Sequence, residues 1–258
     1  EITTRLVGSE MCIRDRVILY SFNESRISSV WEGFSLKWYE ELFRDRDLFQ
    51  ALWNSILLGV ISSCCAAVIG TLGAYGMSKV KFPLKGAVEY VSTLPMMIPE
   101  IILGMVFMAF FSLIGIPFGM GTLVIAHTAF CIPYVFMLVK ARLVGMDKSL
   151  PEAAQDLGAS PVRVFFDIIL PLVAPAIASG MLLAFAMSMD DVIISVFVTG
   201  VDTNTLPVKI YTKLKTGVTP EINALATVML FVILLCLAGA YVLGRKSQTA
   251  VEKAAGGK

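Results

Sequence analysis

Long runs without a charged residue divide the chain into segments of membrane-spanning length. Such runs cover residues 51–78, 101–139, 168–189 and 224–244. An apolar helix of about 20 residues crosses the hydrocarbon core of a bilayer. The pattern therefore predicts an all-α membrane protein that crosses the bilayer several times. The spans that we expect are 51–74, 87–112, 121–141, 172–198 and 223–244.

The ends and interruptions of these runs indicate how the chain is divided. The run 101–139 is too long for one helix, and the Gly and Pro residues of 115–121 predict a tight turn between two spans. Residues 17–22 are interpreted as the last turns of a truncated earlier helix. Residues 1–16 are polar and aperiodic and lack the basic start and apolar core of a signal peptide. We expect them to be a leader foreign to the protein; a genuine flexible N-terminus is the alternative.

Composition excludes several classes of protein. The 258 residues are 57% hydrophobic and 16% charged, against roughly 45–50% and about 25% in soluble domains. A chain of this length holds about six spans with their loops, so no room remains for a separate soluble enzyme domain. The net charge of +1 gives no electrostatic footprint for nucleic acid. Four of the five cysteines lie in apolar runs, so we expect no disulfide framework and no metal site.

Basic residues predict the orientation in the membrane. The segments around 75–86 and 140–170 and the tail after 244 together carry eleven Lys and Arg residues, whereas the segments 23–50 and 199–222 carry seven. Lys and Arg are enriched in cytoplasmic loops. The first three segments are therefore predicted to be cytoplasmic.

Small residues recur on one face of the first complete span. Close approach of helices in lipid needs such residues, so we interpret the stripe as a packing surface, with a pore-lining role as the alternative. Cys64 and Cys65 are interpreted in the same way, as small packing residues. The members of the stripe are Gly59, Ser63, Ala67, Gly70 and Ala74.

The predicted cytoplasmic loop 148–171 carries two helix-start signals. Ser149 with Glu152 three residues later forms a capping-box pattern. Gly158 is suited to the left-handed conformation that ends a helix. Ser160 before Pro161 then predicts the start of a second short helix. A capped amphipathic loop without a partner is the simplest interpretation of these signals alone.

A longer motif in the same loop resembles that of permease subunits of ATP-binding-cassette importers. The motif is E-A-A, three residues, G, nine residues, I, one residue, L-P, and it is matched without a gap by Glu152, Ala153, Ala154, Gly158, Ile168, Leu170 and Pro171. The resemblance implies the transmembrane fold of type I importers, here with five complete spans and the stub of a first. It also implies that the loop docks on an ATPase subunit, which alone uses ATP.

Further segments resemble the spermidine/putrescine branch of these permeases, and its second permease subunit in particular. They include 21–25, Trp38-Tyr39, 190–195 and 205–211. The resemblance covers residues 17–245 and leaves 246–258 as a cytoplasmic tail. It implies a homologous second permease, an extracytoplasmic binding protein and a bacterial inner-membrane location. A permease for another small solute is the alternative.

Three acidic residues in the apolar segments are candidates for the substrate pathway. Charges inside a span are costly and usually face a cavity or a partner. Glu100 follows two prolines in its predicted span, and Asp190 and Asp191 interrupt another. Asp191 shares a helical stripe with Ala184, Ser188 and Ser195, which makes it the better candidate of the pair. The alternatives are pairing with a partner subunit for the two aspartates and a local bond to the broken helix for Glu100.

No catalytic residues are expected. The sequence contains no G-x-x-x-x-G-K-[ST], H-E-x-x-H or G-x-S-x-G motif. We therefore expect a non-catalytic membrane subunit that binds no cofactor or metal of its own. An ion-coupled secondary transporter is a competing interpretation, but it predicts internal inverted repeats, which the chain does not display. His127, the only histidine, is interpreted as a helix–helix hydrogen-bonding residue, with a proton relay as the alternative.

Overall fold

The computed structural model describes residues 15–25, 31–80, 83–147, 149–216, 221–228 and 230–231. Within these ranges the regular structure is helical, apart from one isolated antiparallel bridge between Asn23 and Phe34. The chain forms two compact units. One comprises residues 50–211 and the other comprises residues 1–49 with 212–258. The expected tail and most of the expected leader lie outside the described residues, although positions 15 and 16 are helical.

Helix α3 (Arg46–Lys79) confirms the predicted span at 51–74 and extends it at both ends. Its small residues pack as expected. A Cβ added at Gly59 would lie 2.9 Å from the ring of Phe185 in α9. One added at Gly70 would lie 3.1 Å from the backbone nitrogen of Phe136 in α6. Cys64 and Cys65 differ from the prediction, because they face away from these contacts and are exposed.

The predicted span 87–112 is broken into two helices. α4 (Lys85–Met97) and α5 (Glu100–Leu113) are bent relative to each other by 106°. Pro99 lacks an amide hydrogen and disfavours helical geometry at the preceding residue, and Ile98 is accordingly extended (φ −81°, ψ 132°). Glu100 therefore lies at the start of a helix, directly after the break between α4 and α5. Gly115, with φ +74°, lies in the turn that was predicted after α5.

The core of residues 50–211 lies between α6 (Met120–Val144) and the long helix that ends in α9 (Leu170–Asp190). α6 confirms the predicted span 121–141. The second short helix of the loop is not separate: α8 (Pro161–Val164) and a π-helical turn, η1 (Phe165–Ile169), continue into α9. Together they form a 30-residue helix from Pro161 to Asp190. Pro171 has no amide hydrogen for an ordinary helical bond, and the π-helical turn η1 lies in the turn just before it.

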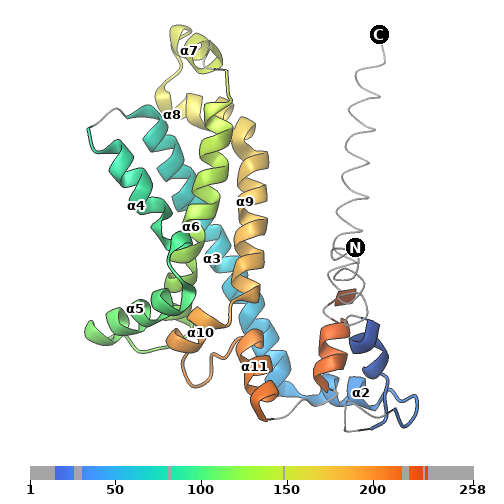
Figure 1. The fold of residues 1–258 in the computed structure, drawn as a ribbon. Coiled ribbons are helices and arrows are strands. Elements are labelled where there is room, and N and C mark those ends of the chain that lie inside the picture. The colour runs from blue at the N-terminus through green and yellow to red at the C-terminus, as the bar shows by residue number, and fades with distance from the viewer. Residues whose placement is uncertain are drawn as a thin grey trace, which may run out of the picture. The chain divides into compact units, whose positions relative to one another are not determined.

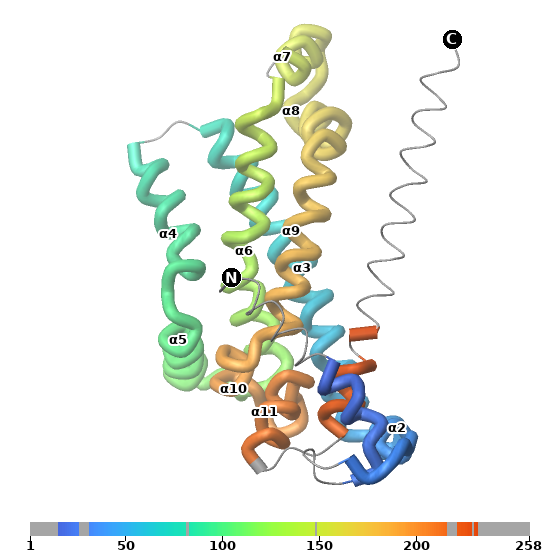
Figure 2. The backbone as a smooth tube through the Cα atoms, turned by 45° about the vertical axis from the view of Figure 1, so that its right-hand side comes forward, coloured from blue at the N-terminus to red at the C-terminus, as the bar shows by residue number. Residues whose placement is uncertain are grey.

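A second break corrects the predicted continuous span 172–198. α9 ends at Asp190, Asp191 is extended (φ −69°, ψ 122°), and α10 (Ile193–Val198) begins a new helix. Figures 1 and 2 both show α10 beside α5, at the end of α9 opposite to α7 (Ser149–Asp156). Within the described part of the chain, three helices are long and apolar enough to cross a membrane, or four if the bent pair α4–α5 is one span. Most of the predicted span 223–244 lies outside the described residues.

The other unit contains the helical residues 15–20, which include part of the predicted stub, and α2 (Lys37–Arg44). Trp38 is buried, and its indole Nε1 donates to the backbone oxygen of Asn23 at 2.6 Å. The hydroxyls of Ser21 and Tyr39 are 2.7 Å apart. Two of the segments that carry the branch resemblance, 21–25 and Trp38-Tyr39, are thus in direct contact.

Candidate functional site: the exposed loop and the two helix breaks

The loop with the E-A-A motif projects from the end of α6 and is anchored at its base. Pro151 in α7 is buried, and Ala154 and Ala159 pack against the core. The helix begins differently from the prediction. Ser149 is its first residue, and its amide donates to Oδ1 of Asp147 at 2.9 Å. This hydrogen bond, with a second from the Ser149 side chain, lowers the pKa of Asp147.

Gly158 ends α7 in the manner that the sequence predicted. Its φ is +86°, in the left-handed region. The Gly158 amide donates to the oxygen of Gln155 at 2.9 Å, and the Ala159 amide donates to that of Ala154 at 3.0 Å. These two bonds define a Schellman motif. Ser160 then accepts a hydrogen bond from the amide of Arg163 at 3.3 Å, which confirms the predicted start of α8.

The outer surface of the loop is open. Glu152, Ala153 and Gly158 are exposed, and Leu157 is 90% exposed. Leu170 and Pro171 lie 9 and 10 residues beyond Pro161, the first residue of the 30-residue helix, which is about 14–15 Å along its axis at 1.5 Å per residue. The structure thus separates the motif into an exposed turn, which contains Glu152 to Gly158, and a helical stem, which contains the Leu-Pro pair.

Asp191 is enclosed within the chain. Its Oδ1 accepts from the amide of Ile194 at 3.1 Å, and its Oδ2 accepts from the amide and hydroxyl of Ser195 at 2.8 and 2.9 Å. Nε2 of His127 lies 3.4 Å from Oδ2, and the carboxylate is only 3% exposed. The residues of the predicted stripe, Ala184, Ser188, Asp191 and Ser195, are all buried, although the break places Ser195 on a different helix from Ala184 and Ser188. His127 of α6 makes the predicted helix–helix hydrogen bonds to Ser188 and Ser195.

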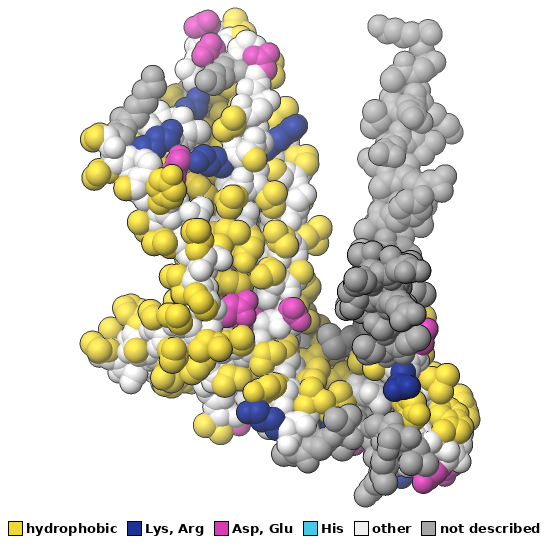
Figure 3. Space-filling model, viewed as in Figure 1, with side chains coloured by type: hydrophobic (Ala, Val, Ile, Leu, Met, Phe, Trp, Pro, Cys, Tyr) yellow, Lys and Arg dark blue, Asp and Glu magenta, His cyan; other side chains and the backbone are white. Residues whose placement is uncertain are grey.

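Glu100 and Asp190 differ from Asp191 because both are exposed. Each lies at a helix break, Glu100 at the start of α5 and Asp190 at the end of α9. Neither has an ion-pair partner among the residues that the structure describes. Figure 3 shows acidic side chains in a largely hydrophobic surface on this side of the protein, near α5 and α10. Their environment is that of charges that face a cavity or a partner.

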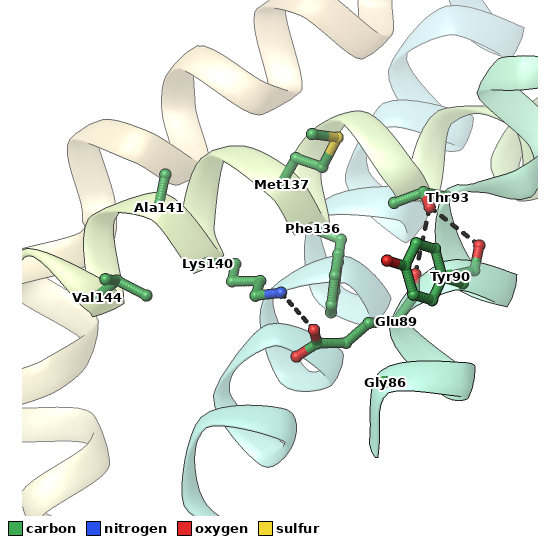
Figure 4. A pocket seen from close by; sticks show the side chains of 9 residues that line it. All are labelled: Gly86, Glu89, Tyr90, Thr93, Phe136, Met137, Lys140, Ala141 and Val144. Atoms are coloured by element: carbon green, nitrogen blue, oxygen red, sulfur yellow. Dashed lines mark hydrogen bonds and ion pairs between the residues drawn. The ribbon is translucent and has the colours of Figure 1, made fainter. Parts of the chain in front are cut away.

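A groove between α4 and α6 contains another acidic residue, which is neutralised. Oε2 of Glu89 is 2.7 Å from Nζ of Lys140, and Figure 4 shows this ion pair beside Phe136 and Tyr90. A paired carboxylate offers little attraction to an external cation. Among the residues described, no group of three or more His, Cys, Asp and Glu side chains could hold a metal ion.

The sequence did not indicate how polar residues of three helices meet at the second break. Ser62 of α3 donates to Ser188 Oγ at 3.3 Å, and Ser188 Oγ is 2.8 Å from Nδ1 of His127. A period of 3.6 residues places each residue on a face of its own helix, but it does not tell which helix that face contacts. The polar character of His127 and Ser188 in apolar runs was the available signal.

Comparison with known proteins identifies the family. Residues 66–252 match the family of binding-protein-dependent transport system inner membrane components. The spermidine/putrescine transport system permease protein PotC of Haemophilus influenzae is 41% identical over 231 residues, which cover 90% of each chain. The putrescine transport system permease protein PotI of Escherichia coli K12 is 41% identical and covers 83% of this chain and 79% of its own.

Solved structures with the same fold are more distant in sequence. A bacterial ABC transporter for import of the acidic polysaccharide alginate matches with a TM-score of 0.69 and 14% identity, over 95% of this chain and 94% of that chain. An amino acid ABC transporter matches with a TM-score of 0.60 and 16% identity, over 81% and 98%. The fold is therefore that of the transmembrane domain of type I ABC importers. The chain belongs to the binding-protein-dependent transport system inner membrane components, multi-pass permeases of the inner membrane, in the branch of the spermidine/putrescine permeases.

Proposed function

We propose that the chain is a permease subunit of an ATP-driven importer and forms part of the pathway of spermidine and putrescine across the inner membrane. The observation that carries this proposal is the 41% identity, over 90% of both chains, to a permease of a spermidine/putrescine transport system. The two exposed carboxylates at the helix breaks add chemistry that suits elongated polycations.

The exposed turn of the E-A-A loop is the proposed docking element for a separate ATPase subunit. A small, exposed helix such as α7 suits insertion into a groove of another protein. The helix from Pro161 to Asp190 runs without interruption from this turn to the second break. A displacement of α7 by the closing ATPase can therefore be transmitted along a rigid element to the level of Asp190.

The remaining partners follow from the type of transporter. A homologous second permease would complete the pathway, and an extracytoplasmic binding protein would deliver the substrate. ATP would be bound only by the ATPase subunits, since this sequence has no phosphate-binding loop. The permease itself would contribute no catalytic group.

Glu100 and Asp190 are the proposed contacts for the moving substrate. Two unit charges 4 Å apart attract each other by about 4 kcal/mol at an effective dielectric constant near 20. Both carboxylates are exposed from this chain, whereas Asp191 is occupied by hydrogen bonds to α10. We therefore assign direct contact to Glu100 and Asp190 and a structural part of the pathway to Asp191.

The test is uptake of labelled spermidine and putrescine by cells whose only polyamine importer is the complete transporter. Asp190→Asn and Glu100→Gln should each reduce uptake per assembled complex about tenfold, the equivalent of about 1.4 kcal/mol. Asp202→Asn, at an exposed position in the turn after α10, serves as the control. Uptake should persist when the proton gradient is collapsed and ATP is kept intact. Full uptake in both carboxylate variants would refute the pathway, and loss of uptake with the gradient would favour an ion-coupled transporter.

A further inference from the structure

The break between α9 and α10 frees backbone groups inside an apolar segment. The first amides of a helix have no partner within the helix, and in a bilayer they must be satisfied by other protein groups. Asp191 accepts from the amides of Ile194 and Ser195, so its carboxylate supplies the start of α10 with acceptors. The position of α10 consequently depends on where the Asp191 side chain is held.

His127 holds that side chain from α6. The imidazole is fully buried, with Nδ1 2.8 Å from Ser188 Oγ in α9 and Nε2 3.1 Å from Ser195 Oγ in α10. Ser195 donates its one hydroxyl hydrogen to Asp191 at 2.9 Å. The hydrogen between His127 and Ser195 therefore belongs to Nε2, which also lies 3.4 Å from Asp191 Oδ2. One ring thus connects α6 to the helices on both sides of the break.

α10 in turn lies directly against α5. A Cβ added at Gly104 would be 2.6 Å from the ring of Phe197 and 3.4 Å from Cα of Ile194. Gly104 is four residues, about one helical turn, beyond Glu100. Asp190 immediately precedes the break on the other side. Asp190 is therefore on a helix that His127 contacts directly, and Glu100 is on α5, which packs against α10, the other helix that His127 contacts.

We propose that His127 is a positioning residue for transport. Its hydrogen bonds to α9 and α10 fix the geometry of the break and keep Asp190 exposed on the pathway. Because α10 packs against α5, they also keep Glu100 exposed there. The proposal rests on the proposed function. His127 itself contacts no substrate, because it is fully buried. An apolar residue would leave α9 and α10 without their shared link and would leave Ser188 without its partner at Nδ1.

The first experiment measures transport. His127→Leu should reduce the maximal rate of spermidine uptake per assembled complex about tenfold, while the apparent KM, which the binding protein sets, stays unchanged. His127→Gln, whose amide can donate and accept, should restore most of the rate. The matched control is Thr128→Val, the neighbouring buried position on α6, whose hydroxyl has no hydrogen-bond partner among the described residues. This variant should transport like the wild type.

The second experiment measures exposure without transport. Asp190→Cys is placed in a chain whose own cysteines are replaced by alanine, and its reaction with a positively charged methanethiosulfonate is timed in the assembled transporter. We expect the rate to fall about tenfold when His127→Leu is added. An unchanged rate would overturn the role of His127 and leave the proposed function intact. No reaction in either background would show that position 190 is not on an aqueous pathway, which would refute both the pathway assignment of Asp190 and the positioning role of His127.

Failure to fold is distinguishable from loss of position. If His127→Leu does not assemble, His127→Asn replaces it, because the shorter amide cannot reach Ser188 and Ser195 together. If both variants lose uptake only in proportion to the amount of assembled complex, His127 is a folding residue and the proposal is wrong.

Discussion

A single methyl group at Gly158 tests the geometry of the exposed loop. The φ of Gly158 is +86°, and a Cβ added there would meet nothing within 4 Å. Gly158→Ala therefore creates no clash, and its cost comes from the backbone alone. The left-handed conformation costs an L-residue roughly 1–2 kcal/mol. The population of the loop with an intact turn should fall by a factor of about 5–30 relative to its alternatives.

The effect should appear in coupling and not in assembly. Gly158 is exposed and outside the buried core, so the amount of protein in the membrane should stay at the wild-type level. Spermidine uptake, and the ATPase activity that loaded binding protein stimulates, should both fall by a factor in that range. Gly158→Pro should have a larger effect, because proline cannot adopt this φ and lacks the amide that donates to Gln155.

Gly145→Ala is the matched control in the same cytoplasmic segment. Gly145 follows α6 with φ −83°, which any residue adopts, and the nearest atom to an added Cβ is 3.8 Å away. This variant should transport at the wild-type rate. If Gly158→Ala also transports at that rate, the turn is not required for coupling and the reasoning fails.

Other predictions concern packing and charge. Gly70→Ala should destabilise the purified protein by about 1–3 kcal/mol, since the new Cβ would approach the α6 backbone to 3.1 Å. The control is Gly76→Ala, where an added Cβ meets open space and the melting temperature should stay unchanged or rise. Equal melting temperatures of the two variants would contradict the close packing at Gly70. Lys213, 2.9 Å from Asp45 and 3.2 Å from Glu221, has its pKa raised by these hydrogen bonds against the opposing effect of burial. Burial is the largest single effect on Asp45 and raises its pKa, but the hydrogen bond and charge of Lys213, together with the backbone amides of Leu48 and Asp47, outweigh it and lower that pKa. The difference in stability between the wild type and Lys213→Met should therefore be constant near neutral pH. It should shrink as the pH falls below 3.8 through the lowered pKa of Asp45, because the carboxylate becomes protonated. It should also shrink as the pH rises above 10.5 through the raised pKa of Lys213, because the ammonium group loses its charge. A difference in melting temperature that persists unchanged at both extremes would exclude these two groups as its source.

Local signals in the sequence predicted the loop with good accuracy. Gly158 and Ser160 have the roles that their residue types favour, because a turn and a helix cap are decided within four or five residues. The start of α7 was misassigned to a capping box at Ser149, although Asp147 accepts the hydrogen bond. Asp147 and Ser149 are both residue types that can cap the start of a helix, and the local pattern does not determine which of them does so.

The positions of the acidic residues were less predictable. Helical periodicity grouped Asp191 with Ser188 and Ser195, which are all buried, and favoured Asp191 over Asp190 as the pathway residue; the proposed function reverses that preference because Asp190 is the exposed one. The periodicity assumed a continuous helix through residue 191, whereas the chain is extended there and the helix ends at Asp190. A break moves consecutive residues to different surroundings, and Asp190 and Asp191 are accordingly exposed and buried.

The sequence by itself determined the apolar helical segments, the exposed turn and the family, because each depends on residue type and spacing along the chain. Tertiary structure alone decided that α5 and α10 meet at Gly104 and that His127 joins α6 to both sides of the second break. These contacts connect residues up to 93 positions apart, as for Gly104 and Phe197, and no local periodicity encodes which helix faces which. A helix start inside an apolar segment needs hydrogen-bond partners; Asp191 supplies them locally to α10, but only the packed fold places His127 against both sides of the break.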